Sequence, residues 1–271
     1  VLTIISLSRS ISTVACVFTR TSEKITCVRV IPMIKWLIKK QDEAAVAEIR
    51  KQFGFCDAVA RVLYNRGLTD RKSIESFFDI DIANLHDPLL LADMEKATSR
   101  IKRAVENGEK ITVYGDYDVD GITSVVLMYR CLTSLGANVD YYIPDRTEEG
   151  YGLNSSALRS IYDSGTSLIV TVDTGTTAVE EIAEAENYGL DVIVTDHHEC
   201  KPTLPVCVAV VNPKRPDSVY PYKELAGVGV VFKLVCALIG DSTKAFSLYG
   251  DLVSIGTIAD IMPLVDENRV L

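Results

Sequence analysis

The 271-residue chain has no closely spaced pair of cysteines and no long apolar run. Its seven cysteines are scattered, and Cys200 and Cys207 are the nearest two along the sequence. This spacing excludes a CxxC zinc or redox site and fits reduced thiols better than a disulfide framework. The lack of a run long enough to cross a bilayer excludes a membrane-spanning helix. We therefore expect a cytoplasmic protein with no membrane partner.

Positive charge is also in short supply, with 28 Lys and Arg residues against 37 Asp and Glu residues and a net charge of −9. Taken alone, this balance argues against a nucleic-acid-binding protein. A metal site would neutralise some of the carboxylates locally, so net charge does not decide the question. A hydrophobic content of 48% is enough for one large core or two smaller ones.

Three regions differ in composition. Residues 1–32 carry four basic residues and one acidic residue, and the first methionine is Met33. A short apolar run at 11–18 raises the alternative of a secretory signal, but no small-residue cleavage site follows it. We expect 1–32 to be a non-native or poorly ordered leader, 33–108 to be a helical cap, and 109–271 to be the main domain.

Hydrophobic spacing separates the last two regions. Helical patterns are expected at 41–53, 56–68, 71–78, 94–108, 121–136, 153–165, 177–189, 228–240 and 245–262. Short apolar runs rich in β-branched residues are expected to be strands at 110–116, 138–145, 167–173, 190–196 and 206–212. Alternation of strands with helices predicts an α/β fold, with a parallel sheet covered by helices on both faces and preceded by a small helical region.

Three of the expected strands end in an aspartate: Asp116, Asp173 and Asp196. Two of the three histidines of the chain, His197 and His198, follow the third of these strands directly. A single aspartate at a strand end is more often a helix cap or a turn residue. Parallel strands bring their carboxyl ends to one edge, where ligands bind, so this set predicts a shared acidic site there.

The run VYGDYDVDGITS (113–124) has two other interpretations. It begins like an EF-hand calcium loop, but the twelfth position is Leu127, where a bidentate glutamate is required, and the run follows a strand. It also begins like the DxDx[TV] motif of aspartyl-phosphate phosphatases, but Asp120 occupies the position of the Thr or Val. Neither alternative fits well.

Four motifs occur in order along the chain: GDYDVDG (115–121), TVDTG (171–175), DHH (196–198) and GTIADIMPL (256–264). Together they resemble the motifs of the DHH phosphoesterase superfamily. Four further runs are similar to the RecJ-like single-strand-specific 5′-to-3′ DNA exonucleases within it: VLYNRGL (62–68), EGYGLN (149–154), VVNPK (210–214) and LAGVGVVFKL (225–234). The resemblance covers residues 34–271. It implies a further domain that binds nucleic acid. The 109–271 region would be truncated before that domain.

The resemblance also implies roles for individual residues. The metal ligands would be Asp116, Asp118, Asp173, His197 and Asp260. A catalytic set would be formed by His198 near the scissile phosphate, with Asp120 and Asp196 orienting the ligands. Four ligand carboxylates balance two divalent cations, and oxygen ligands with one imidazole suit Mn²⁺ or Mg²⁺. One departure is Tyr114, where many relatives carry a histidine.

Substrate contacts are expected from Arg146, which would clamp a phosphate, and from Lys214. Alternatively, Arg146 is a solvent-exposed loop residue without a role in binding. The GVG run at 227–229 either presents backbone N–H groups to a phosphate or permits close helix packing, and we favour packing.

The resemblance implies an enzyme, a metal-dependent hydrolase that degrades single-stranded DNA from the 5′ end in recombination and repair. This truncated chain would be inactive if the further domain is required. Single-stranded DNA would be the main partner, a single-strand-binding protein and a helicase are further candidates, and a monomer is expected. The alternatives are a DHH phosphodiesterase acting on short oligonucleotides or cyclic dinucleotides, and a catalytically inactive DNA-binding scaffold.

Overall fold

The computed structural model describes residues 17–21, 24–28, 40–150 and 152–271. The chain divides into two compact units, Val1–Phe78 and Asp79–Leu271. Within the leader expected at 1–32, the described residues form one antiparallel pair, and the rest of that range lies outside them. The two paired strands are β1 (Val17–Thr21) and β2 (Lys24–Val28).

The described residues of the first unit form three short helices: α1 (Glu43–Phe53), α2 (Asp57–Asn65) and α3 (Arg71–Phe78). Asp42 caps α1 by accepting backbone N–H groups, and Gly54 ends it with a φ of 70°. Apolar side chains at helical spacing meet in a small core of Val46, Ile49, Ala60, Leu63 and Ile74. These helices occupy the segments in which the sequence predicts them.

The fourth helix of the expected cap belongs to the second unit. This helix, α4 (Met94–Glu106), packs against α8 (Gly227–Ile239) and β7 (Ala209–Val211). The boundary between the two compact units therefore lies between Phe78 and Asp79, whereas the sequence predicts it at 108/109.

The second unit is built on a five-stranded parallel sheet with the order β4-β3-β5-β6-β7. The other strands are β3 (Lys110–Gly115), β4 (Asn138–Tyr142), β5 (Leu168–Val172) and β6 (Asp191–Thr195). The chain places β4 on one side of β3 and β5 on the other, so the strand order reverses between β3 and β5. Ligands bind at such a switch point in open parallel sheets.

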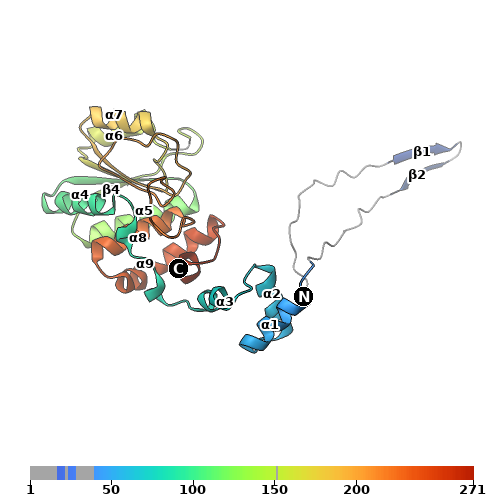
Figure 1. Ribbon diagram of the computed structural model, residues 1–271. Coiled ribbons are helices and arrows are strands. Elements are labelled where there is room, and N and C mark those ends of the chain that lie inside the picture. The colour runs from blue at the N-terminus through green and yellow to red at the C-terminus, as the bar shows by residue number, and fades with distance from the viewer. Residues whose placement is uncertain (1–16, 22–23, 29–39, 151) are drawn as a thin grey trace. The chain divides into compact units, whose positions relative to one another are not determined.

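Helices cover both faces of this sheet, which confirms the predicted fold class (Figure 1). Residues of β5 alternate between two cores: Leu168, Val170 and Val172 face the α4, α5, α8 and α9 side, and Ile169 faces the α6 and α7 side. The remaining helices are α5 (Val119–Ser134), α6 (Ser155–Asp163), α7 (Val179–Asn187), α9 (Ser242–Ala259) and α10 (Glu267–Val270), with 3₁₀ turns η1 (Ile82–Asn84) and η2 (Pro88–Leu90).

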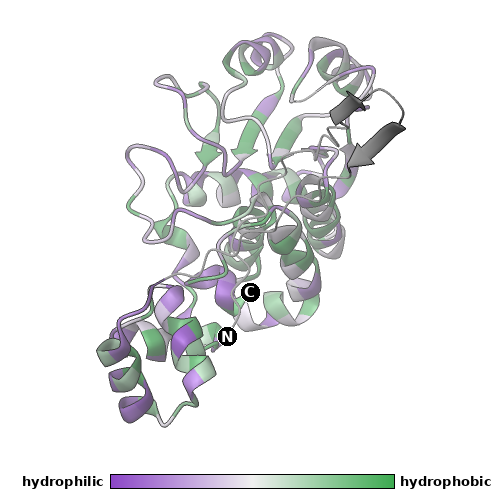
Figure 2. Ribbon diagram, turned by 90° about the vertical axis from the view of Figure 1, so that its right-hand side faces the viewer, coloured by the Kyte–Doolittle hydropathy of each residue, from purple (hydrophilic) through white to green (hydrophobic). Residues whose placement is uncertain are grey.

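All five strands are shorter than the sequence predicts, and β4 and β7 differ most. β4 ends at Tyr142, ahead of Pro144, and is partly exposed because it is the edge strand. β7 is only three residues long. Colouring by hydropathy shows hydrophobic segments in the strands of the sheet, and helices in which hydrophobic and hydrophilic residues alternate (Figure 2). Among the described residues, we find no helix with the length and apolar character needed to cross a membrane.

Candidate metal centre

The first acidic turn lies between β3 and α5. Asp116 follows β3, is 4% exposed, and accepts the backbone N–H of Tyr117 at 2.7 Å. Asp118 is the N-cap of α5 and accepts the N–H of Gly121 at 2.8 Å. A Cβ on Gly121 would lie 2.5 Å from the carbonyl oxygen of Asp116, so this turn requires glycine. The local sequence thus places two carboxylates at the end of β3.

Asp173 follows β5 in a left-handed conformation with a φ of 59°, and it is 1% exposed. Burial raises the pKa of its carboxyl well above the usual range, and the nearby charges of Asp120 and Asp118 raise it further. No hydrogen bond from the described residues reaches its buried Oδ1. A strained, buried and incompletely paired carboxylate is costly unless a cation compensates it.

Asp196 fixes the turn that follows β6. Its carboxylate accepts the backbone N–H groups of Thr176, His197 and His198. It also lies 2.8 Å from Nδ1 of His198. Burial alone would raise the pKa of Asp196, but the hydrogen bond and charge of His198, with the backbone N–H groups, lower it overall. In return, the Asp196 hydrogen bond raises the pKa of His198 to about 9.

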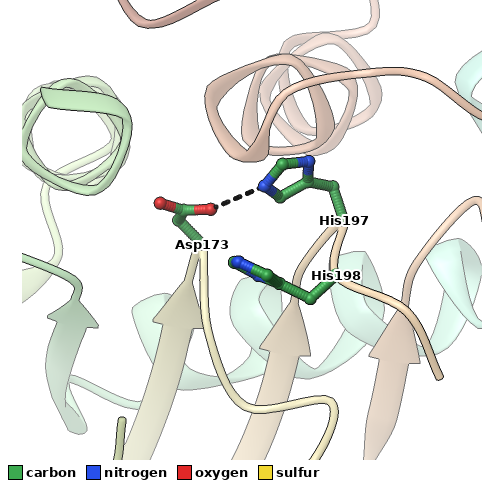
Figure 3. A group of neighbouring side chains, drawn as sticks. All are labelled: Asp173, His197 and His198. Carbon is green, nitrogen blue, oxygen red and sulfur yellow. Dashed lines mark ion pairs between the residues drawn. The ribbon is translucent and has the colours of Figure 1, made fainter. Parts of the chain in front are cut away.

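His197 points its Nε2 atom into the acidic group. This nitrogen lies 3.2 Å from Oδ1 of Asp173, 3.7 Å from Oδ2 of Asp260 and 3.9 Å from Oδ2 of Asp120. Figure 3 shows the imidazole of His197 directed toward Asp173, with the ring of His198 on the same side of the strand ends. His197 is 7% exposed, so these groups meet in a largely buried space.

The structure thus brings together all five expected metal ligands. Their ligand atoms form overlapping groups within 4.8 Å: Asp116, Asp118 and Asp173; Asp173, His197 and His198; Asp120, His197 and Asp260. Carboxylates with imidazole and no thiolate suit Mn²⁺ or Mg²⁺. The buried Oδ1 of Asp173, which accepts no hydrogen bond from the described residues, also fits a divalent cation, because such an ion would compensate its charge.

Asp120 is the point at which the acidic group meets helix α8. Its two oxygens accept the backbone N–H groups of Gly227 and Val228 at 2.7 and 2.8 Å. Burial raises the pKa of Asp120 to about 6, although these hydrogen bonds and His197 oppose the shift. The first two N–H groups of the GVG run therefore bind a carboxylate of the protein. The run also approaches the acidic group closely, because a Cβ on Gly227 would lie 2.3 Å from Oδ1 of Asp173.

Comparison with known proteins identifies the family. Residues 110–257 match the N-terminal domain of the DHH family. The chain belongs to the DHH family. Its similarity to the RecJ single-stranded-DNA-specific exonuclease of Bacillus subtilis is 48% identity over 238 residues, which are 88% of this chain and 30% of the relative.

Two solved structures of DHH-family relatives extend the comparison. RecJ from Thermus thermophilus in complex with Mn²⁺ is 30% identical, with a TM-score of 0.68, and the match covers 86% of this chain and 33% of that chain. The same protein in complex with Mg²⁺ is 28% identical, with a TM-score of 0.57, and the match covers 86% and 29%. The present chain thus spans about a third of the length of these relatives.

The two expected substrate contacts differ in their surroundings. Arg146 is exposed, and its guanidinium lies 5.3 Å from the ring centroid of Tyr117. Burial raises the pKa of Asp116, and the charge of Arg146 is one of the effects that oppose this rise. Arg146 is therefore close to the DHH-family acidic turn. Lys214 instead pairs with Glu199 at 3.1 Å.

Sequence reasoning missed several residues that shape the site. Tyr114 is fully buried in the α6–α7 core, and its hydroxyl donates to the carbonyl of Gly152. It supports the loop that carries Arg146. Thr176 and Asn212 are both fully buried beneath the histidine pair. The runs TVDTGT and VVNPK contain these two residues, but nothing in the sequence shows that the runs meet.

Proposed function

We propose that this chain is the metal-binding catalytic part of a RecJ-like exonuclease that degrades single-stranded DNA from its 5′ end in recombination and repair. The observation that carries the proposal is the convergence of four carboxylates and His197 in overlapping ligand groups, together with a buried Oδ1 of Asp173 that accepts no hydrogen bond from the described residues. The 48% identity to a RecJ exonuclease supports the choice of substrate. Because the chain spans only part of such relatives, we infer that full activity requires more of the protein.

In this proposal, Asp116, Asp118, Asp173, His197 and Asp260 hold two divalent cations, Mn²⁺ or Mg²⁺. When bound, the cations would supply an activated water and stabilise the leaving oxygen. The hydrogen bond to Asp196 raises the pKa of His198 to about 9 in the metal-free protein, which favours a cationic imidazole. A cationic imidazole beside the acidic group is suited to bind the scissile phosphate. Asp120 supports the ligands through α8.

Substrate binding would use positive charge at the rim of the site. Arg146, stacked over Tyr117, would hold a phosphate of the strand, and Lys214 would be a second and weaker contact. We further propose that the protein acts as a monomer in the cytoplasm. A single-strand-binding protein and a helicase would be its partners during repair.

The test compares substrates for the protein that contains this chain. With Mn²⁺, a long 5′-labelled single strand should release labelled mononucleotide at once, and the matching duplex should resist. The Asp173→Asn variant is the control for contaminating nucleases. Cleavage of a dinucleotide or cyclic dinucleotide, with none of the long strand, would favour the alternative DHH phosphodiesterase. No cleavage of any substrate by a protein that binds Mn²⁺ would favour an inactive scaffold.

A further inference from the structure

Asn212 lies at the end of β7 and is completely buried. Its amide nitrogen donates two hydrogen bonds, one to Oγ1 of Thr176 and one to the backbone carbonyl of His198, both at 2.9 Å. Its amide oxygen accepts the backbone N–H of Lys214 at 2.8 Å. Asn212 therefore uses both ends of its amide to connect β7 with the turns after β5 and β6.

These bonds close a ring of buried contacts beneath His198. The N–H of Thr176 donates to Oδ2 of Asp196, and Oδ1 of Asp196 binds the backbone N–H and Nδ1 of His198. His198 is thus held at its N–H, its carbonyl and its ring nitrogen. Asp196 provides two of these three contacts, and Asn212 provides the third.

We propose that Asn212 is a positioning residue for His198, and this inference rests on the function proposed above. The ring of His198 lies on the same side as Asp173, where the scissile phosphate would be bound (Figure 3). Its direction depends on the backbone of the turn. Without the amide donor of Asn212, the buried acceptors of Thr176 and His198 lose a partner, and the turn relaxes to find others. Asn212 acts through His198 and does not touch the substrate.

The first test needs no enzymatic activity. The chain has three histidines, so the ring signals of His86, His197 and His198 can be assigned in an NMR spectrum of the metal-free protein by single substitutions. Asn212→Ala should shift or split the His198 signal and leave that of His86 in place. Asn212→Asp, which keeps the shape but places a carboxylate oxygen against the backbone carbonyl of His198, should do the same.

A matched control separates positioning from general loss of stability. Asn268 is also buried, and its amide nitrogen donates to the carbonyls of Glu224 and Pro263. Asn268→Ala should lower the melting temperature to a similar degree without moving the His198 signal. An unchanged His198 signal in Asn212→Ala, or an equal change in Asn268→Ala, would overturn the proposal even if the protein proved not to be a nuclease.

The second test is a double-mutant cycle on single-stranded DNA with saturating Mn²⁺. Asn212→Ala should reduce kcat by about 10–100-fold, as other supporting residues of metal sites do, with Mn²⁺ affinity within about threefold of wild type. The same substitution in a His198→Ala background should cause no further loss, because its effect passes through His198. Additive losses would contradict a role through His198. Inactive wild-type protein would count against the proposed function, and the NMR test would still decide the role of Asn212.

Discussion

Gly227 lies so close to Asp173 that a Cβ on the glycine would stand 2.3 Å from the carboxylate oxygen Oδ1. The N-terminus of α8 is held there because Asp120 binds the N–H groups of its first two residues. The helix therefore forms one wall of the metal centre. The positive end of its dipole also favours the carboxylates gathered beside it.

Gly227→Ala should abolish tight Mn²⁺ binding, because the new methyl group displaces either Asp173 or the helix. We expect the free energy of unfolding to fall by about 1–3 kcal/mol, the usual range for overpacking. Isothermal titration with Mn²⁺ and urea unfolding measure the two effects. Gly229→Ala is the matched control, since the nearest neighbour of its methyl group would be the side chain of Leu225, at 3.3 Å. Normal Mn²⁺ affinity in Gly227→Ala would contradict the close contact.

Asp173→Asn should stabilise the metal-free protein while it removes Mn²⁺ binding. The substitution deletes a buried charge among like charges, and asparagine tolerates the left-handed backbone at this position. Asp173→Ala should be less stable than Asp173→Asn by about 1 kcal/mol, because alanine does not favour that backbone. Thermal unfolding in EDTA compares the variants. If Asp173→Asn were less stable than the wild type, the Asp173 carboxylate would not destabilise the metal-free protein, and the prediction would be wrong.

The contribution of Asp120 to the stability of the metal-free protein should fall as pH rises from about 4 to about 6. Burial raises the pKa of Asp120 from 3.8 to about 6 in the folded state. In that interval the folded protein keeps a proton that the unfolded chain has lost, so raising the pH favours unfolding. Mn²⁺ should oppose this trend, because it binds the deprotonated carboxylates. Urea unfolding of the wild type and of Asp120→Asn across this range in EDTA measures this contribution, and a stability difference between them that does not change with pH would contradict it.

Lys233→Met should lower the free energy of unfolding by about 3–5 kcal/mol, because it leaves Glu267 buried without its ion-pair partner. Lys233 of α8 pairs with this glutamate, which also accepts the hydroxyl of Tyr220. Lys244→Met, at an exposed position on α9, is the control and should have little effect. Equal stability of the two variants would show that the Lys233–Glu267 pair does not stabilise the packing of α10.

The sequence predicts the sheet because its strands are apolar and end in recognisable turns, and it predicts the acidic residues because parallel strands share one edge. Two relationships could not be predicted. The partners of Asp120 are backbone groups of α8, which lie more than a hundred positions away along the chain. The role of Asn212 depends on the contact of β7 with the turns after β5 and β6, and no local pattern encodes such a contact.

The domain boundary illustrates the same limit. Helix α4 has the same amphipathic pattern as α1 to α3, so the sequence groups them together. Tertiary packing against α8 and β7 assigns α4 to the α/β unit. Local periodicity indicates that a helix has a face to bury but does not identify the surface that covers it.

Titration of metal-free protein with Mn²⁺ near neutral pH tests the central claim most directly. We predict that two Mn²⁺ ions bind each chain and that Asp173→Asn, which alters the carboxylate shared by two of the ligand groups, removes tight binding. No Mn²⁺ binding to the wild-type protein, or binding by Asp173→Asn equal to that of wild type, would contradict a metal centre at the carboxyl edge of the sheet.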